Sequence, residues 1–177
     1  MDKDIIRFIA DVKGGIAETL ITMLFRRSGY AVKLHGRWKA VDLNSDPKVK
    51  LWEGDGSLYP TTNHPDLIIS CKGKKELLEV KYRSEGKLHR HLESNHILKE
   101  QCIQWGDAEK FGVPLSVVIV SQECPPYITV LKAPYFSGTG WFIKRVPIME
   151  AGWDLRQDIY EECVRLLKAG LFDGVNS

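Results

Sequence analysis

The chain has 177 residues, of which 44% are hydrophobic and 27% are charged, and its net charge is +2 at pH 7. This length suffices for one domain with its own hydrophobic core, and no low-complexity linker or internal repeat divides it. The cysteines form no Cys-x-x-Cys pair, which argues against an iron–sulfur cluster or a structural zinc site; they are Cys71, Cys102, Cys124 and Cys163. With no signal peptide and no apolar segment of membrane-spanning length, we expect an intracellular, cytoplasmic protein without membrane contact.

The first predicted elements are a helix and a strand. The helix includes Gly14-Gly15-Ile16-Ala17-Glu18, and apolar residues follow at helical spacing; these are Leu20, Ile21, Leu24 and Phe25. Residues 30–34 form an apolar run that predicts a strand. Residues 35–64 contain Arg37, Trp38, Lys39 and Trp52, which would suit contacts to the bases or backbone of a nucleic acid.

The next predicted element is a β-hairpin. Residues 66–70 are apolar and β-branched, residues 76–83 alternate, and the polar segment between them has Gly73 at its centre. A turn centred on Gly73 places Asp66 opposite Val80, or opposite Glu79 or Lys81 after a shift of one residue. Glu79 and Lys81 share one face of their strand, while Leu78, Val80 and Tyr82 occupy the other.

A charged pair on an apolar strand requires a compensating partner. Burying Glu79 unpaired is costly, and a divalent cation is a natural partner for it and for Asp66. Carboxylate oxygens suit Mg²⁺ or Mn²⁺. In the alternative interpretation, Glu79 and Lys81 form a solvated ion pair that contributes little to stability. Asp66 would then simply end a loop after Pro65.

The remaining elements complete an α/β pattern. We predict a helix over residues 94–111, strands over 115–120, 127–131 and 140–146, and a linking segment through Tyr135 and Phe136. Asp154 is the predicted cap of a last helix closed by Gly170, whose apolar stripe consists of Leu155, Ile159, Cys163, Leu166 and Leu167. This helix covers the sheet or packs on a second subunit, and the pattern leaves both open.

Positive charge gathers in two windows. Residues 72–91 carry seven Lys or Arg against three Glu, and residues 33–50 carry five against two Asp. Both windows flank the hairpin, as binding of a phosphate backbone requires, although uneven charge also arises on any surface. The predicted nucleic-acid contacts are Lys72, Lys74, Arg83, Lys87, Arg90, Arg37 and Lys39.

Pro65-Asp66 together with Glu79-Val80-Lys81 resembles the PD-(D/E)xK motif of the restriction-endonuclease-like nucleases, and Glu18 matches the glutamate that many of them carry on the preceding helix. The likeness covers residues 14–121 and is greatest to archaeal Holliday-junction resolvases and Mrr/RecB-type small nucleases. It implies an α/β fold with a restriction-endonuclease-like core, in which helices flank a mixed central β-sheet. One nuclease domain would span residues 1–177, with its core over 14–146 and a C-terminal helical extension over 147–177.

The resemblance also implies a mechanism. Asp66, Glu79 and the Val80 carbonyl would hold Mg²⁺, with Mn²⁺ as a substitute and Glu18 acting through water. Lys81 would orient or deprotonate the attacking water, and Gln101, one turn before Trp105, is similar to the glutamine of a Gln-x-x-x-Tyr element. The expected protein is a homodimeric endodeoxyribonuclease that acts on branched or duplex DNA. The alternatives are a restriction or mobile-element endonuclease and a non-catalytic nucleic-acid-binding protein on the same fold.

Overall fold

The protein has a mixed α/β architecture, seen in a computed structural model that describes residues 3–34, 65–83, 114–123, 125–132, 135–137, 140–142, 144–170 and 172. The described helical segments are α1 (Lys3–Arg27), the short 3₁₀ helix η2 (Ile148–Glu150) and α4 (Gln157–Lys168). The first strands are β1 (Ala31–Leu34), β2 (Leu67–Cys71), β3 (Lys74–Tyr82) and β4 (Leu115–Val120). They are followed by β5 (Ile128–Leu131), β6 (Tyr135–Ser137), β7 (Gly140–Phe142) and β8 (Arg145–Pro147).

Six strands form the central sheet in the order β1-β2-β3-β4-β5-β8. Neighbours are antiparallel except β3 and β4, which run parallel with Val80 beside Val118. A parallel pair requires a long crossover connection, and the chain between Tyr82 and Leu115 is long enough for one. The helix predicted over residues 94–111 falls in this interval and lies outside the described residues.

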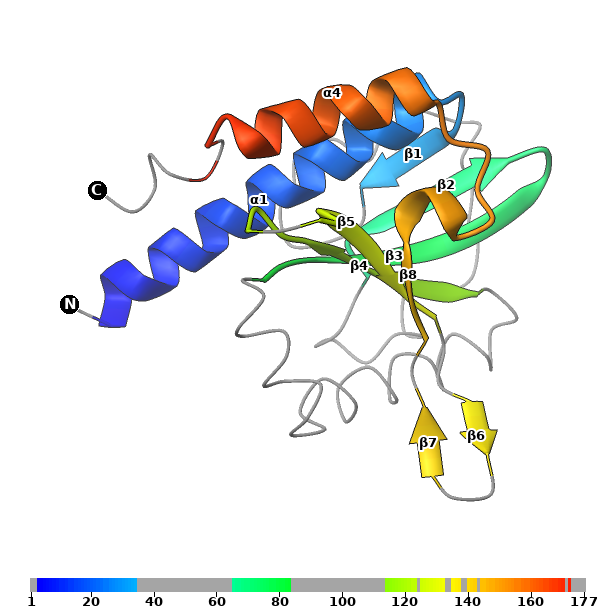
Figure 1. Ribbon diagram of the computed structural model, residues 1–177, viewed down its shortest axis with the longest axis horizontal. Helices are drawn as coiled ribbons and strands as arrows, with labels where there is room; N and C mark the ends of the chain where they lie inside the picture. The colour runs from blue at the N-terminus through cyan, green and yellow to red at the C-terminus, as the bar shows by residue number, and fades with distance from the viewer. Residues whose placement is uncertain are drawn as a thin grey trace, which may run out of the picture.

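The two long helices pack together on one face of the sheet (Figure 1). Helix α1 buries Leu20, Ile21, Leu24 and Phe25, the stripe that its apolar spacing predicts. The described stripe of α4 joins the same core cluster through Ile159, Cys163 and Leu167, so the helix covers the sheet within its own chain. None of the described helices combines the length and apolar character needed to cross a membrane.

The two long helices compare differently with the sequence pattern. Helix α1 runs from Lys3 through Gly14 and Gly15, which the predicted helix includes, because two glycines weaken a helix without forbidding it and neither position is crowded. Asp154 does not cap the last helix; Arg156 occupies the N-cap position and makes no side-chain cap hydrogen bond. The backbone N–H of Asp154 instead donates to the Tyr30 hydroxyl at 2.9 Å.

The single strand predicted over residues 140–146 is divided into two. Strand β7 pairs with β6 in a separate two-stranded ribbon, with Phe136 beside Trp141, whereas β8 joins the main sheet beside β5. The ribbon extends away from the central sheet in Figure 1. Residues 135–137 therefore form a strand rather than a simple link, because their pairing partner is the first part of the predicted strand.

Candidate functional site

The β2–β3 hairpin turn sets the alignment of the predicted site. The two turn residues, Lys72 and Gly73, have φ values of 51° and 79°, as in the type I′ turns that favour two-residue hairpins. Cys71 consequently pairs with Lys74, and Leu67 pairs with Leu78. This register differs by one residue from the register that a turn centred on Gly73 would give. Continued by one residue, it places Asp66 beside Glu79, which is one of the three predicted alignments.

Asp66 is held against the backbone of β3. Its Oδ2 atom accepts a hydrogen bond from the Val80 N–H at 2.7 Å. Asp66 immediately precedes the first paired residue of β2, so its side chain lies at the end of the paired segment, beside the Glu79-Val80-Lys81 segment. The structure thus brings the two halves of the sequence motif into direct contact.

Glu79 and Lys81 form a shielded ion pair. Lys81 Nζ lies 2.8 Å from Glu79 Oε1, and only 11% of the Glu79 side chain and 19% of the Lys81 side chain are exposed. The second carboxylate oxygen of Glu79, Oε2, is buried and has no hydrogen-bond partner among the residues that the structure describes. This pair is not the solvated surface ion pair of the alternative interpretation, because both side chains are largely shielded from solvent. The buried oxygen also carries a desolvation penalty that a solvated carboxylate would not have.

The two faces of β3 divide as the alternation predicts. Leu78 and Val80 belong to the core cluster beneath α1, whereas Glu79 and Lys81 project from the opposite face. That opposite face is itself apolar around them, since Leu77 and Val117 are buried there. The charged pair therefore stands in surroundings of low polarity, which strengthens its electrostatic interactions.

The electrostatics of the site are dominated by negative charge. Burial and, after it, the Glu79 carboxylate raise the pKa of the Asp66 carboxyl to about 7, and the charge of Glu18 on α1 acts in the same direction. The Val80 N–H and the Lys81 ammonium lower this pKa but do not compensate. Glu18, Glu79 and Lys81 thus each lie within electrostatic reach of Asp66.

The donor set fits a hard divalent cation that retains water ligands. No cluster of three or more His, Cys, Asp or Glu side chains able to hold a metal by themselves occurs within the described ranges. Mg²⁺, however, usually keeps several waters and binds through one or two carboxylates. Asp66 and Glu79 supply two carboxylates, and the partnerless Glu79 Oε2 provides a free acceptor.

The other predicted site residues fall into three groups. Gln101, Lys87, Arg90, Arg37 and Lys39 lie outside the described residues. Lys72 and Lys74 lie at the hairpin turn, and Lys74 is five positions before Glu79, which is roughly 17 Å of extended strand. Only Arg83, which follows β3 and donates from Nη1 to the Tyr82 carbonyl at 2.8 Å, lies near Lys81 along the chain.

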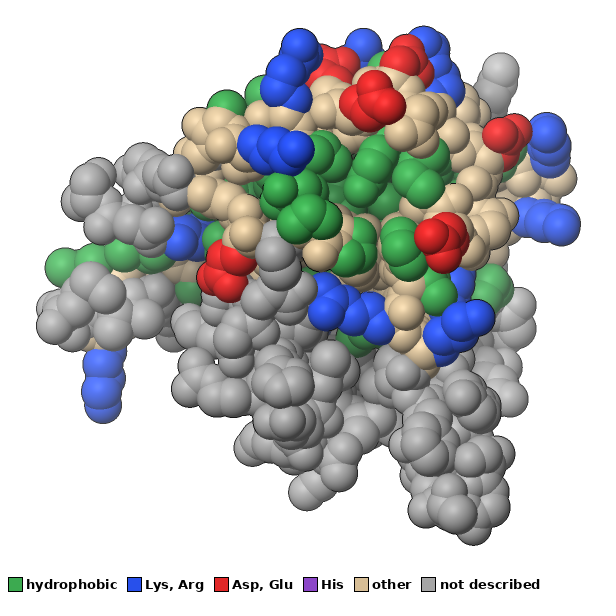
Figure 2. All heavy atoms as spheres, in the orientation of Figure 1, with side chains coloured by type: hydrophobic (Ala, Val, Ile, Leu, Met, Phe, Trp, Pro, Cys, Tyr) green, Lys and Arg blue, Asp and Glu red, His purple; other side chains and the backbone are tan. Residues whose placement is uncertain are grey.

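The helical face offers no substitute for these basic residues. Figure 2 shows Lys and Arg side chains interspersed with Asp and Glu over this face. The Arg27 and Glu162 side chains, for example, pair across α1 and α4 at 2.5 Å. The described residues of this face therefore form no extended positive surface of the kind that a phosphate backbone attracts.

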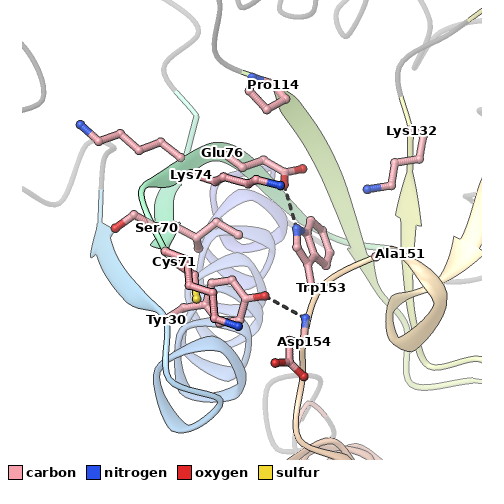
Figure 3. A pocket seen from close by; sticks show the side chains of 14 residues that line it. Tyr30, Ser70, Cys71, Lys74, Glu76, Pro114, Lys132, Ala151, Trp153 and Asp154 are labelled. Carbon is pink, nitrogen blue, oxygen red and sulfur yellow. Dashed lines mark hydrogen bonds between the residues drawn. The ribbon is translucent and has the colours of Figure 1, made fainter.

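A cavity at the hairpin turn involves residues that sequence patterns did not single out. Tyr30, Trp153 and Lys132 line it together with the turn lysines (Figure 3). Trp153 reaches Glu76 from a position 77 residues away, so no local spacing could connect them. In the sequence, only the local composition could have indicated this cavity, because a tryptophan lies beside polar residues before the last helix.

Comparisons with known proteins add no assignment, because no protein-family model and no curated protein matches the chain. The features of the site that bear most directly on its chemistry are the contact between Asp66 and Val80 and the shielded pair of Glu79 and Lys81.

Proposed function

We propose that the chain is a metal-dependent endodeoxyribonuclease of the PD-(D/E)xK type that hydrolyses phosphodiester bonds in branched or duplex DNA. The observation that carries this proposal is the hydrogen bond from the Val80 N–H to Asp66, which holds one carboxylate beside Glu79 and Lys81. The order of elements also supports it. Among the described elements, a helix precedes three strands and a fourth strand follows them in one mixed sheet, which agrees with the element order and mixed sheet that the superfamily resemblance implies.

The proposed metal ligands are the carboxylates of Asp66 and Glu79 and the Val80 carbonyl, with Glu18 acting through water. A bound Mg²⁺ or Mn²⁺ ion lowers the pKa of coordinated water and offsets charge on the phosphate. In the absence of a cation, the site holds more negative than positive charge, and the raised pKa of Asp66 expresses this excess. The carboxylates are therefore arranged to favour a cation.

Lys81 is the proposed positioning group for the attacking water. Glu79 holds its ammonium group at 2.8 Å and so fixes its direction. An ammonium donor at this position can orient a water molecule and stabilise negative charge that develops on the phosphate. No covalent nucleophile is required, so the chain needs only these carboxylates, the lysine and water.

The test is a cleavage assay with Mg²⁺ on a four-way junction, a flap and a random-sequence duplex. We expect wild-type protein to cut, and Asp66→Ala and Lys81→Ala to lose at least about 100-fold in rate, in line with the usual worth of acid–base and electrostatic groups. Exposed Asp11→Ala and Lys3→Ala are the matched controls and should cut normally. Absence of metal-dependent cutting on every substrate would refute the enzyme proposal, and cutting by both site variants would refute the site.

The same panel separates the DNA classes. Preference for the junction supports a resolvase-like activity that contributes to DNA recombination or repair, and for which we propose a homodimer able to cut two strands. Junction-independent cutting at one sequence would instead support a restriction or mobile-element endonuclease. Binding without cutting would support a nucleic-acid-binding protein. Light scattering of the purified chain measures the proposed dimer directly.

A further inference from the structure

A second site lies at the turn end of the β2–β3 hairpin. It is a cavity of about 370 Å³ between the hairpin and the segment that leads into α4 (Figure 3). This volume falls at the lower end of the range of roughly 300–1,000 Å³ for small-molecule sites. Its basic lining residues come from two chain segments, the hairpin and the end of β5, and are Lys72, Lys74, Lys75 and Lys132.

The aromatic walls of the cavity are held in place. Trp153 donates its Nε1 hydrogen to Glu76 Oε2 at 2.7 Å, and its ring meets Phe25 edge-on at 5.0 Å. Tyr30 accepts the Asp154 N–H at 2.9 Å and meets the same Phe25 ring at 5.2 Å. Because Phe25 and these hydrogen bonds hold both rings in place, the cavity is formed before any ligand enters. A preformed cavity reduces the entropic cost of binding.

The charges that line the cavity are mainly positive, because four lysines stand against two carboxylates, those of Glu76 and Asp154. Glu76 is already engaged by the Trp153 indole and by the Ser116 hydroxyl. Within the described ranges, no carboxylate forms an ion pair with any of the three hairpin lysines. Lys132 lies over the Trp153 ring at 4.5 Å from its centroid. Lysines without carboxylate partners around a preformed aromatic wall favour an anion that also carries an apolar or planar part.

This cavity is distinct from the Asp66 site. Glu76 and Ile69 pair across β2 and β3 on the face that carries α1, whereas Glu79 and Lys81 project from the other face. Glu76 is also three residues along β3 from Glu79, which is roughly 10 Å of strand. A ligand in the cavity would therefore not contact Asp66 or Glu79 directly, and its binding requires no metal chemistry.

We propose that this cavity binds the phosphate of a nucleotide, with the base against the apolar wall formed by Ile69, Ala151 and Trp153 and the phosphate among Lys74 and Lys132. A free mononucleotide and the phosphorylated end of a nucleic-acid strand present the same chemistry. The size of the cavity suits one nucleotide unit rather than a length of duplex. The proposal is independent of cleavage at the Asp66 site.

The test measures binding of three probes in EDTA at physiological salt: AMP, a 5′-phosphorylated oligothymidylate and its 5′-hydroxyl counterpart. We expect Lys74→Ala and Lys132→Ala each to weaken binding of the phosphorylated probes about tenfold, the usual worth of a charged hydrogen bond to phosphate. Lys3→Ala removes an equal charge at the far end of α1 and should leave binding unchanged. Asp66→Asn should also leave it unchanged, which separates this site from the proposed nuclease site.

The probes also distinguish the source of the phosphate. Binding of AMP without binding of either oligonucleotide supports a free nucleotide, and preference for the 5′-phosphorylated strand over its 5′-hydroxyl form supports a strand end. Equal binding of the two oligonucleotides without binding of AMP would overturn the proposal, as would equal weakening by Lys3→Ala. Failure of all three probes to bind would overturn it as well.

Cys71 provides an independent readout because it lines the cavity as a partly exposed free thiol, while Cys163 is fully buried. We expect saturating probe to slow alkylation of Cys71 at least fivefold, measured by peptide mass spectrometry so that each cysteine is followed separately. The Lys74→Ala variant should lose this protection at the same probe concentration. Unchanged Cys71 alkylation in wild-type protein with bound probe would place the ligand elsewhere and overturn the assignment.

Discussion

Replacing Asp66 with asparagine should stabilise the metal-free protein at alkaline pH. The pKa of Asp66 is about 7 in the folded protein, above its ordinary value of 3.8, chiefly because of burial and of the neighbouring Glu79 carboxylate. Folding therefore favours the protonated form, and ionising this group costs free energy. Asparagine removes the charge, yet its amide oxygen can still accept the Val80 N–H.

The sign and size of the effect follow from proton linkage. A carboxyl whose folded-state pKa is raised contributes its stability fully below pH 4, and this contribution is lost as pH rises through 7. A rise of about three pKa units corresponds to roughly 4 kcal/mol in the free energy of unfolding. Asp66→Asn should therefore match wild type at pH 4 and exceed it by up to about 4 kcal/mol at pH 8.

The assay is urea unfolding in EDTA at pH 4, 6 and 8, with exposed Asp11→Asn as the control for loss of one carboxylate. Asp11→Asn should follow wild type closely at all three pH values, because a surface charge contributes little. The reasoning fails if the difference between Asp66→Asn and wild type is independent of pH, or if wild type is the more stable at pH 8. Adding millimolar Mg²⁺ at pH 8 should then stabilise wild type and not the variant.

Three further predictions concern residues that support the two sites structurally, and each is checked by urea unfolding at pH 7. Gly73→Ala should cost about 1–2 kcal/mol because φ is 79° at this position, and unchanged stability would mean that the turn adopts another conformation. Trp153→Phe should cost about 1–3 kcal/mol because it leaves a Glu76 oxygen without its donor, whereas equal stability would show that this hydrogen bond contributes nothing. Phe25→Ala should cost about 3–5 kcal/mol, since its fully buried ring supports both Tyr30 and Trp153, and a loss below 1 kcal/mol would contradict that role.

The hairpin shows what local sequence can and cannot predict. Alternating apolar residues were sufficient to predict β2, β3 and the face that carries Glu79 and Lys81, because burial enforces a period of two. The register was left among three alignments, because the turn requires Lys72 at φ 51°, a conformation that lysine rarely adopts. A more typical Asn-Gly or Asp-Gly sequence would have indicated the two-residue turn.

Element boundaries were less predictable where packing competes with propensity. The apolar spacing after Gly14 and Gly15 was sufficient to predict a helix through them, because its following turns are buried against the sheet and this burial outweighs the low helix propensity of glycine. Asp154 has the chemistry of a helix cap, but its backbone is drawn to the Tyr30 hydroxyl and the helix begins later. At Asp154 a contact distant in sequence therefore outweighed the local preference.

Some residues of the candidate site could be predicted from local sequence, and others could not. Asp66, Glu79 and Lys81 lie within one hairpin, so their proximity follows from local pairing and could be predicted. Glu18 comes from a separate helix, and only a resemblance to known nucleases pointed to it. The contact between Trp153 and Glu76 spans 77 residues and had no local signature, so the second cavity became visible only in the folded chain.

The arrangement around Asp66 is unfavourable for a purely structural role. The charges of Glu79 and Glu18 both act on Asp66 against the single ammonium group of Lys81, a buried Glu79 oxygen has no partner among the described residues, and Asp66 ionises only near neutral pH. Replacing buried charges with apolar residues of similar size is often neutral or stabilising, so stability alone gives no reason for this cluster. A divalent cation would remove the repulsion, satisfy the free oxygen and release the Asp66 proton. Proton release on metal binding, largest below pH 7, is therefore the signature that separates a metal site from a costly ion pair.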